Sequence, residues 1–187
     1  MNTKEISKKI VEELDFALGS IGETEGEKFV EAVLAADRVF VAGAGRSLLM
    51  IRGFAMRLMH LGFQAYVVGE TVTPAIGEKD LLVIASGSGE TGTLTVMANK
   101  AKKVGAALAA ITIYPESTIG KLADHVVQIK AATTKGERDS VGSFQPGANM
   151  FEQSLLLFCD AAVIQIIQKC HIEEENKKLM ARHANLE

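Results

Sequence analysis

Residues 80–95, DLLVIASGSGETGTLT, pass from an apolar run into a turn rich in glycine and hydroxyls and then into a helical pattern. Residues 81–85 have the length and composition of a strand buried on both faces, as in a parallel sheet. The turn alternates serine with glycine: Ser86, Gly87, Ser88 and Gly89. A helix from about Glu90 would point its first backbone N–H groups into the same space as the turn hydroxyls and Thr91. The stretch therefore predicts an α/β fold with a cradle for a small phosphorylated ligand.

Two other interpretations of this turn stay open. Serine and threonine before a helix are common N-caps, so Ser88 could satisfy only the amides of its own helix. Residues 87–92 also fit G-x-G-x-x-G, the fingerprint of a dinucleotide site. That fingerprint expects an acid about 20 positions further on, at the end of the next strand. The first acid there is Glu116, beyond Pro115 and somewhat late.

A second loop of the same build lies earlier in the chain. Residues 38–42, RVFVA, predict a strand. The strand is followed by a glycine turn at 43–45 and then by a helical segment that runs to about Leu61. Ligands of open α/β sheets bind outside the carboxyl ends of the strands, near the point where the strand order reverses. We therefore expect the two loops to converge on one site. The candidate ligand contacts are Gly45, Arg46 and Ser47 in the first loop and Ser86, Gly87, Ser88, Gly89, Glu90 and Thr91 in the second.

Length and composition predict one compact α/β domain. The chain has 187 residues, of which 48% are hydrophobic, enough for a large core. Its 20 basic and 23 acidic residues include no basic block longer than a pair, which disfavours nucleic acid and anionic membranes as partners. Residues 1–20 lack the apolar core of a signal peptide, and we expect no apolar run of the ~20 residues that a bilayer requires. A cytoplasmic protein is expected.

Cysteine and histidine positions indicate no metal site and no disulfide. Cys159 and Cys170 lie in one predicted helix, about 16 Å apart by helical rise, which is too far for a bridge within the helix. Both are expected to be reduced core residues. No Cys-x-x-Cys, His-Glu-x-x-His or other cluster of ligating residues occurs. The sequence therefore predicts neither a metal nor a cofactor.

Strands and helices alternate along the chain after two opening helices. The predicted strands are residues 38–42, 65–68, 81–85, 106–113 and 125–129. The predicted helices are residues 4–18, 23–36, 46–61, 91–104, 118–123 and 147–169. Five strands separated by helices or short crossovers indicate a parallel sheet with helices on both faces. Residues 131–142 are expected to form a mobile surface loop, and residues 173–187 a charged tail.

Glu152 is the candidate catalytic base. At 100° per residue, Leu155 and Cys159 lie near it on one face of its helix, whereas Ser154 and Gln165 lie on the opposite side. An acid on the apolar face is unusual. Partial burial would raise its proton affinity and suit it to removing a proton from carbon beside a carbonyl. The alternative is that Glu152 only gains from the dipole of its helix.

Basic residues offer further candidates. Arg46 lies next to the first glycine turn and is the expected ligand contact, whereas Arg57 and His60 on the same helix are expected to be structural or at an interface. That helix is apolar nearly all round, which predicts burial, partly against another subunit. His183 lies in the terminal run RHANLE at 182–187, for which a solvated tail without function is the alternative.

Several segments resemble the sugar isomerase (SIS) domain family and, within it, the 3-hexulose-6-phosphate isomerases. They are VAGAGRS at 41–47, FAMRLMHLGF at 54–63, SGSGET at 86–91, PESTIGKLAD at 115–124, QPGANMFEQSLLLFCDA at 145–161 and HANLE at 183–187. The likeness covers almost the whole chain. A generic SIS domain would share the loops, whereas the compact length and the HANLE ending point to this isomerase branch. The sequence departs from this branch at Leu48-Leu49, where a smaller residue is expected at one position. A bulkier side chain there would narrow the pocket or lie against a helix partner.

The resemblance implies a three-layer flavodoxin-like fold with a five-stranded parallel sheet. It further implies a homotetramer and the interconversion of D-arabino-hex-3-ulose 6-phosphate with D-fructose 6-phosphate, a step of formaldehyde fixation in the ribulose monophosphate pathway. One SIS domain is expected to span residues 1–187, with two N-terminal helices and a functional C-terminal tail.

The resemblance also implies roles for the candidate residues. Glu152 would carry a proton between adjacent carbons through an enediol, and His183 of a neighbouring subunit would act on the sugar oxygens. The phosphate would be held by Ser47, Ser86, Ser88 and Thr91. A sugar-phosphate sensor without activity, an isomerase of another sugar phosphate and a nucleotide-binding oxidoreductase remain as alternatives.

Overall fold

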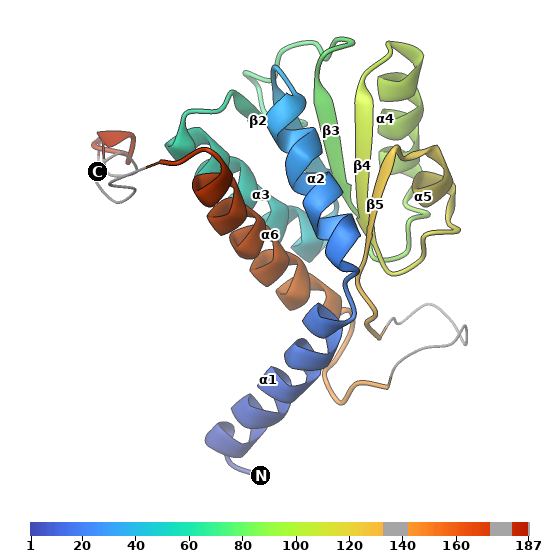
Figure 1. The fold of residues 1–187 in the computed structure, drawn as a ribbon. Coiled ribbons are helices and arrows are strands. Elements are labelled where there is room, and N and C mark those ends of the chain that lie inside the picture. Colours follow the sequence, from blue (N-terminus) through green and yellow to red (C-terminus); the bar gives the residue numbers. More distant parts are fainter. Residues whose placement is uncertain (133–141, 173–180, 187) are drawn as a thin grey trace.

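The computed structural model contains one five-stranded parallel sheet with helices on both faces (Figure 1). The strands are β1 (Val39–Gly43), β2 (Ala65–Val67), β3 (Leu81–Ala85), β4 (Ala107–Thr112) and β5 (His125–Gln128). The helices are α1 (Thr3–Gly19), α2 (Glu23–Ala35), α3 (Gly45–Leu61), α4 (Gly92–Lys103), α5 (Thr118–Leu122) and α6 (Asn149–Lys169). The structure describes residues 1–132, 142–172 and 181–186, so most of the loop predicted at 131–142 and of the tail predicted at 173–187 lies outside the described residues.

The strand order β2-β1-β3-β4-β5 confirms the predicted flavodoxin-like sheet. Each pair of neighbouring strands is parallel. The chain moves outward from β1 to β2 and then returns to β3 on the other side of β1, so the order reverses between β1 and β3. Gly43 and Ala85 are paired at the carboxyl ends of these two strands. The two loops that follow therefore open at the same point of the sheet edge.

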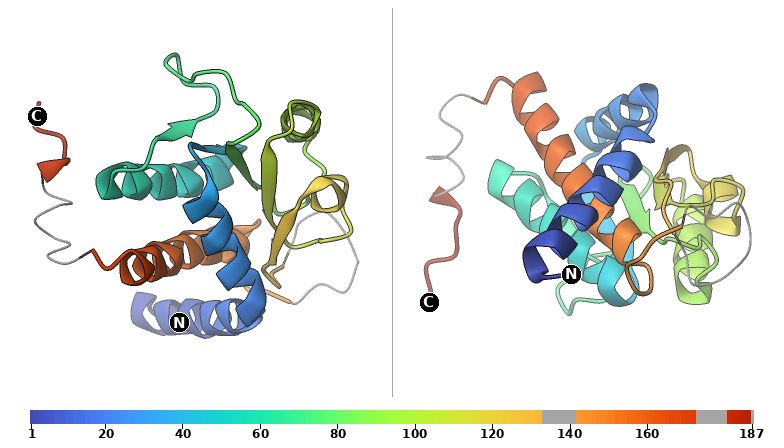
Figure 2. Two further views of the ribbon diagram at one scale, coloured as in Figure 1. Left: turned by 45° about the horizontal axis from the view of Figure 1, so that its top comes forward. Right: turned by 90° about the horizontal axis from the view of Figure 1, so that it is seen from below.

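Helices lie on both faces of the sheet (Figure 2), and alternating side chains of the strands belong to the two core layers beneath them. Val39 and Val41 of β1 belong to the layer under α1, α2, α3 and α6, whereas Phe40 belongs to the layer under α4 and α5. In the first layer the ring of Phe29 lies 5.7 Å from that of Phe54 and 5.3 Å from that of Phe158. This aromatic cluster joins α2, α3 and α6, and so holds the two helices that begin at the sheet edge.

Helix α6 corrects three of our expectations. By length and composition α6 could cross a membrane, so an apolar run of the kind that we did not expect does exist. However, ten residues of α6 are buried, in a layer shared with α1, α2 and α3. Ser154, predicted on the polar side, is fully buried and donates to the Met150 carbonyl at 2.7 Å. Cys159 is buried, and burial raises the pKa of its thiol, whereas Cys170 is exposed and not a core residue.

Helix α1 is tied to the segment that precedes α6. Glu13 accepts hydrogen bonds from the Ser143 hydroxyl at 2.8 Å, the Phe144 backbone N–H at 3.0 Å and the Gln145 side-chain amide at 2.8 Å. Burial alone would raise the pKa of Glu13, but these donors outweigh it and leave the pKa below its ordinary value. The carboxylate therefore links the first helix to the chain that leads into Glu152.

We expect Glu13→Gln to lower the thermal midpoint at pH 7 by about 2–4 °C, because a charged acceptor strengthens these bonds. A lowered native pKa contributes stability above the pKa of the unfolded chain, and this contribution is lost as the pH falls through the native pKa. The difference between wild type and variant should therefore shrink below the ordinary glutamate pKa of 4.5. Calorimetry at fixed protein concentration measures it, with exposed Glu12→Gln as the matched control. A pH-independent difference would contradict the assignment.

Candidate active site

The first loop passes from β1 into α3 in a tight turn. A Cβ on Gly43 would lie 2.9 Å from the backbone nitrogen of Leu48, so only glycine allows the first turn of α3 to approach the strand this closely. Ser47 is buried in that turn, and Gly45 has a φ of +55°. Of the two leucines that depart from the resemblance, Leu48 packs against the core and Leu49 is exposed.

The second loop directs hydroxyls and amides into a common space. The Ser86 hydroxyl lies 3.4 Å from that of Thr91 and accepts from the Gly89 N–H at 3.2 Å, and the Ser88 hydroxyl accepts from the Glu90 N–H at 3.3 Å. The serines thus satisfy amides of the loop itself, which precede α4, and Ser88 does not cap the helix as the alternative interpretation expected. The side chain of Thr91, the N-cap of α4, makes no capping hydrogen bond. The first turn of α4 therefore keeps amides for a ligand anion.

Glu90 anchors the second loop to the start of α5. Its carboxylate accepts from the backbone N–H of Thr118 at 2.8 Å and from its hydroxyl at 2.7 Å, and the Ile119 N–H donates to the Gly89 carbonyl at 3.1 Å. A Cβ on Gly89, where φ is +62°, would clash with the Ser117 hydroxyl. Direct contact of Glu90 with a ligand stays a prediction, to which the structure adds this anchoring role.

Arg46 joins the first loop to the candidate base. Its Nη1 donates to Oε2 of Glu152 at 3.0 Å and also bonds Oδ1 of Asn149. The Glu152 side chain is 13% exposed, so this acid is largely withdrawn from water and paired with a cation. Asn149 was missed by sequence reasoning, although it lies one helical turn before Glu152 and hence on the same face.

The second loop also lies against the first turn of α6. A Cβ on Gly87 would be 3.3 Å from Cδ1 of Phe151, the residue next to Glu152. The carboxyl ends of β1 and β3 and the beginning of α6 therefore bring together nearly all of the predicted site residues. The arrangement offers hydroxyls and helix amides for an anion beside a paired, largely buried carboxylate. Within the described residues, no group of three or more His, Cys, Asp and Glu is placed to hold a metal.

His183 is not brought to this site within one chain. Its ring stacks on that of His60, with the centroids 5.7 Å apart and the planes at 24°. His60 belongs to the last turn of α3, whereas Arg46 belongs to the first, so about 21 Å of helix separate them. The two candidate catalytic residues of one chain therefore lie at opposite ends of α3.

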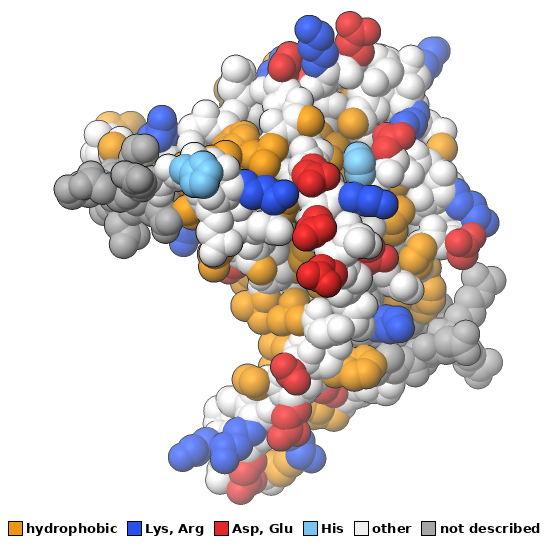
Figure 3. Space-filling model, in the orientation of Figure 1, with side chains coloured by type: hydrophobic (Ala, Val, Ile, Leu, Met, Phe, Trp, Pro, Cys, Tyr) orange, Lys and Arg blue, Asp and Glu red, His pale blue; other side chains and the backbone are white. Residues whose placement is uncertain are grey.

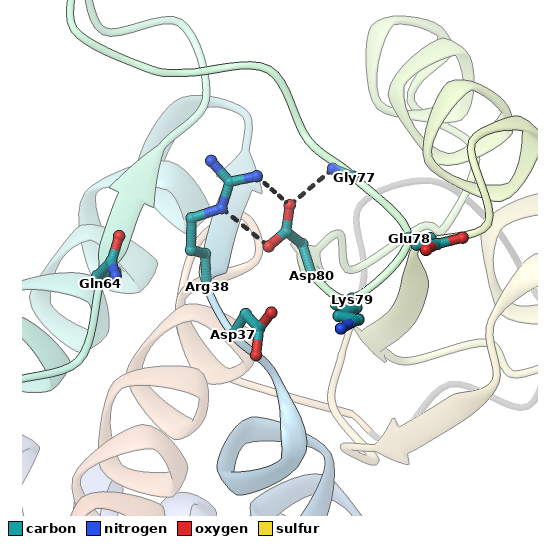
Figure 4. A pocket seen from close by; sticks show the side chains of 7 residues that line it. All are labelled: Asp37, Arg38, Gln64, Gly77, Glu78, Lys79 and Asp80. Carbon is teal, nitrogen blue, oxygen red and sulfur yellow. Dashed lines mark hydrogen bonds and ion pairs between the residues drawn. The ribbon is translucent and has the colours of Figure 1, made fainter.

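A hollow of about 500 Å³ opens at the other end of the sheet (Figure 4). Its lining is polar: Asp37, Arg38, Gln64, Gly77, Glu78, Lys79 and Asp80. Buried Asp80 accepts from Nε of Arg38 at 2.9 Å, from its Nη2 at 2.6 Å and from the Gly77 N–H at 2.6 Å. Burial raises the pKa of Asp80, but these donors and the charge of Arg38 lower it by more. This bidentate pair links the residue before β1 to the residue before β3, and we assign it a structural role.

A family model of the SIS domain matches residues 33–158. The chain belongs to the SIS domain family. The matched region of the SIS domain runs from α2 into α6 and includes both loops and Glu152. The fold and family expected from the sequence are confirmed.

Relatives of this SIS domain carry one recurrent name. The chain is 42% identical over 187 residues to a 3-hexulose-6-phosphate isomerase of Bacillus subtilis (strain 168), covering all of both chains. It is 50% identical over 150 residues to one of Mycobacterium gastri, covering 80% of this chain and 74% of the relative. Its fold matches a hypothetical protein from Methanococcus jannaschii, whose crystal structure infers that same function, with a TM-score of 0.84, 29% identity and coverage of 98% and 99%.

Proposed function

We propose that this chain is an isomerase that interconverts D-arabino-hex-3-ulose 6-phosphate and D-fructose 6-phosphate. The observation that carries the proposal is the Arg46–Glu152 pair between two hydroxyl-bearing loops. Full-length similarity to a 3-hexulose-6-phosphate isomerase supports the choice of substrate. The activity would serve formaldehyde fixation in the ribulose monophosphate pathway, in the cytoplasm.

The proposed reaction moves a carbonyl from C3 to C2 by proton transfer alone. Glu152 removes the proton from C2, which lies beside the C3 carbonyl, and an enediolate forms over the two carbons. A proton then passes from the C2 oxygen to the C3 oxygen, and Glu152 returns its own proton to C3. No atom or electron is gained or lost, so the step requires no external oxidant or reductant.

The remaining residues of the site divide between the two ends of the substrate. Ser47, Ser86, Ser88 and Thr91 would hold the phosphate together with the first amides of α4. Arg46 would orient Glu152 and counter the negative charge that develops on the enediolate oxygens. The backbones of Gly45, Gly87 and Gly89 would line the ligand space, and the missing side chains of Gly87 and Gly89 make room for Phe151 and Ser117.

A homo-oligomer, with a tetramer as our prediction, would complete the site. His183 would reach the sugar oxygens from a second copy, because its own chain holds it at the far end of α3. Large apolar side chains are exposed on helices α1, α3 and α6, which lie on one face of the sheet. Figure 3 shows apolar patches on part of this surface. The exposed side chains are Val11 and Phe16 on α1, Leu49, Met56 and Met59 on α3, and Leu157 and Ile164 on α6. Exposed apolar surface of this kind supports association of copies.

A coupled assay tests the proposed reaction. Formaldehyde, ribulose 5-phosphate and a separate hexulose-phosphate synthase would supply the substrate, and fructose 6-phosphate formation would be followed. We expect formation only when this chain is present. Absence of product with retained binding of sugar phosphate would favour another substrate or a sensor. Calorimetry with NAD and NADP tests the alternative of a nucleotide-binding oxidoreductase. Measurable binding of either nucleotide would support that alternative.

Loss of the Glu90 anchor is expected to raise KM with little change in kcat. Without its bonds to Thr118 the phosphate loop loses its orientation, and Glu90→Ala should raise KM about five- to tenfold, the equivalent of one net hydrogen bond. Thr118→Val should have a similar effect, and exposed Glu116→Ala, which removes a charge near α5, should have none. A lower KM in Glu90→Ala would mean instead that the carboxylate faces and repels the phosphate.

A further inference from the structure

The C-terminal segment 181–186 contacts the last turn of α3 through two adjacent residues. Nη1 of Arg182 donates to the His60 carbonyl at 3.3 Å, and the ring of His183 stacks on the ring of His60. Gly62, the C-cap of α3, has a φ of +98°, and a Cβ there would lie 3.0 Å from Nη2 of Arg182. The end of α3 is thus shaped to let the guanidinium approach its backbone.

His60 is buried, with only 4% of the residue exposed. Its Nδ1 has no hydrogen-bond partner among the described residues. Burial lowers the pKa of His60, and the charges of Arg57 and His183 lower it further. A neutral His60 ring can stack on the His183 ring without the repulsion that two charged rings would have.

We infer that His60 is a positioning residue for His183. Its ring provides a flat surface on which the His183 imidazole rests, and its carbonyl fixes Arg182 one residue earlier. The part of this inference that concerns catalysis rests on the proposed function, which gives His183 its catalytic role; the contact between the two rings does not. His60 lies about 21 Å along α3 from Arg46, so it acts through His183 and not through the candidate site of its own chain. An assembled enzyme would receive the end of α3 and the tail histidine as one unit.

Two variants separate a stacking role from a chemical role. His60→Ala removes the ring, whereas His60→Phe keeps a flat aromatic surface of similar size. Imidazole NMR of the full-length protein with ¹³Cε1-labelled histidine gives four signals, one for each histidine, and His183→Gln assigns the signal of interest. We expect His60→Ala to abolish the ring-current displacement of the His183 signal and His60→Phe to preserve it. Arg182→Ala should reduce the displacement, whereas Arg182→Lys should restore part of it.

Kinetics on the same variants test the consequence for catalysis. We expect His60→Ala to lower kcat about 10- to 100-fold, the range that small misplacement of a catalytic group produces, with KM changed less than about twofold. His60→Phe should stay within about threefold of wild type. Thermal unfolding of both variants checks that the fold is intact.

Three results would overturn the inference. An unchanged His183 signal in His60→Ala would mean that His60 does not hold the tail. A lost displacement with full kcat would mean that the contact does not position a catalytic group. A loss of activity in His60→Phe as large as in His60→Ala would assign the imidazole itself a chemical role. The NMR result requires no turnover, so an inactive wild type would reject the proposed function and still leave the tail contact decided.

Discussion

Glu152→Gln is expected to lower kcat by about 10³-fold while KM changes less than about threefold. Glutamine has the shape of glutamate and keeps an oxygen that can accept from Arg46, so the pair between α3 and α6 retains its geometry. It cannot take up and return a proton. Loss of the base therefore removes stabilisation only in the transition state, which lowers kcat and leaves substrate binding almost intact.

The matched control is Asp160→Asn, the same chemical change at an exposed position of α6. It should retain wild-type kinetics. Steady-state assays in both directions, together with binding of fructose 6-phosphate by calorimetry, make the measurement. A Glu152→Gln variant with near-normal kcat and weaker binding would reject Glu152 as the base and leave it the structural role of a first-turn acid.

Most of the fold follows from local patterns in the sequence. The strands β1 and β3 are short apolar runs, and each is followed by a glycine-containing turn. Both faces of these strands are buried, and this is why their apolar residues are continuous and do not alternate with polar ones. Because both loops leave the carboxyl ends of adjacent parallel strands, their convergence could be predicted before any contact was seen. The prediction required only that the strand order reverse between them.

The contacts that define the site could not be predicted in the same way. Arg46 and Glu152 are 106 positions apart in the chain, and nothing in either helix specifies which residue it will face. Glu90 was placed with the ligand because it follows the serines, but its partner Thr118 comes from a helix that packs beside the loop.

The wrong prediction that Ser154 lies on a polar side of its helix has a related cause. A helical wheel that assumes one polar side fails for α6, which packs in a layer with three other helices. The buried face of α6 is therefore wide enough to include Ser154, whose hydroxyl is satisfied by the carbonyl one turn earlier.

Removal of residues 182–187 is expected to abolish turnover without unfolding the protein. The deletion removes His183 and the Arg182 contact with α3 but none of the core or of the phosphate loops. Circular dichroism and the thermal midpoint should remain close to wild type, and fructose 6-phosphate should still bind. His183→Gln in the full chain is the point-mutation control, and it should lose most of the same activity. Full activity of the deletion would assign the tail no catalytic function.

Mixing two inactive variants decides which copy supplies His183. The deletion of 182–187 retains Glu152, and Glu152→Gln retains the tail, so a hybrid assembly contains one complete site only if base and histidine come from different chains. Random pairing of equal amounts would restore about one quarter of wild-type activity, because half of the pairs are hybrid and one of their two sites is intact. Co-refolding the variants and assaying the mixture makes the measurement, with each variant refolded alone as control. No recovery of activity would mean that Glu152 and His183 act within one chain. The tail would then have to move across the length of α3, about 21 Å from His60 to Arg46.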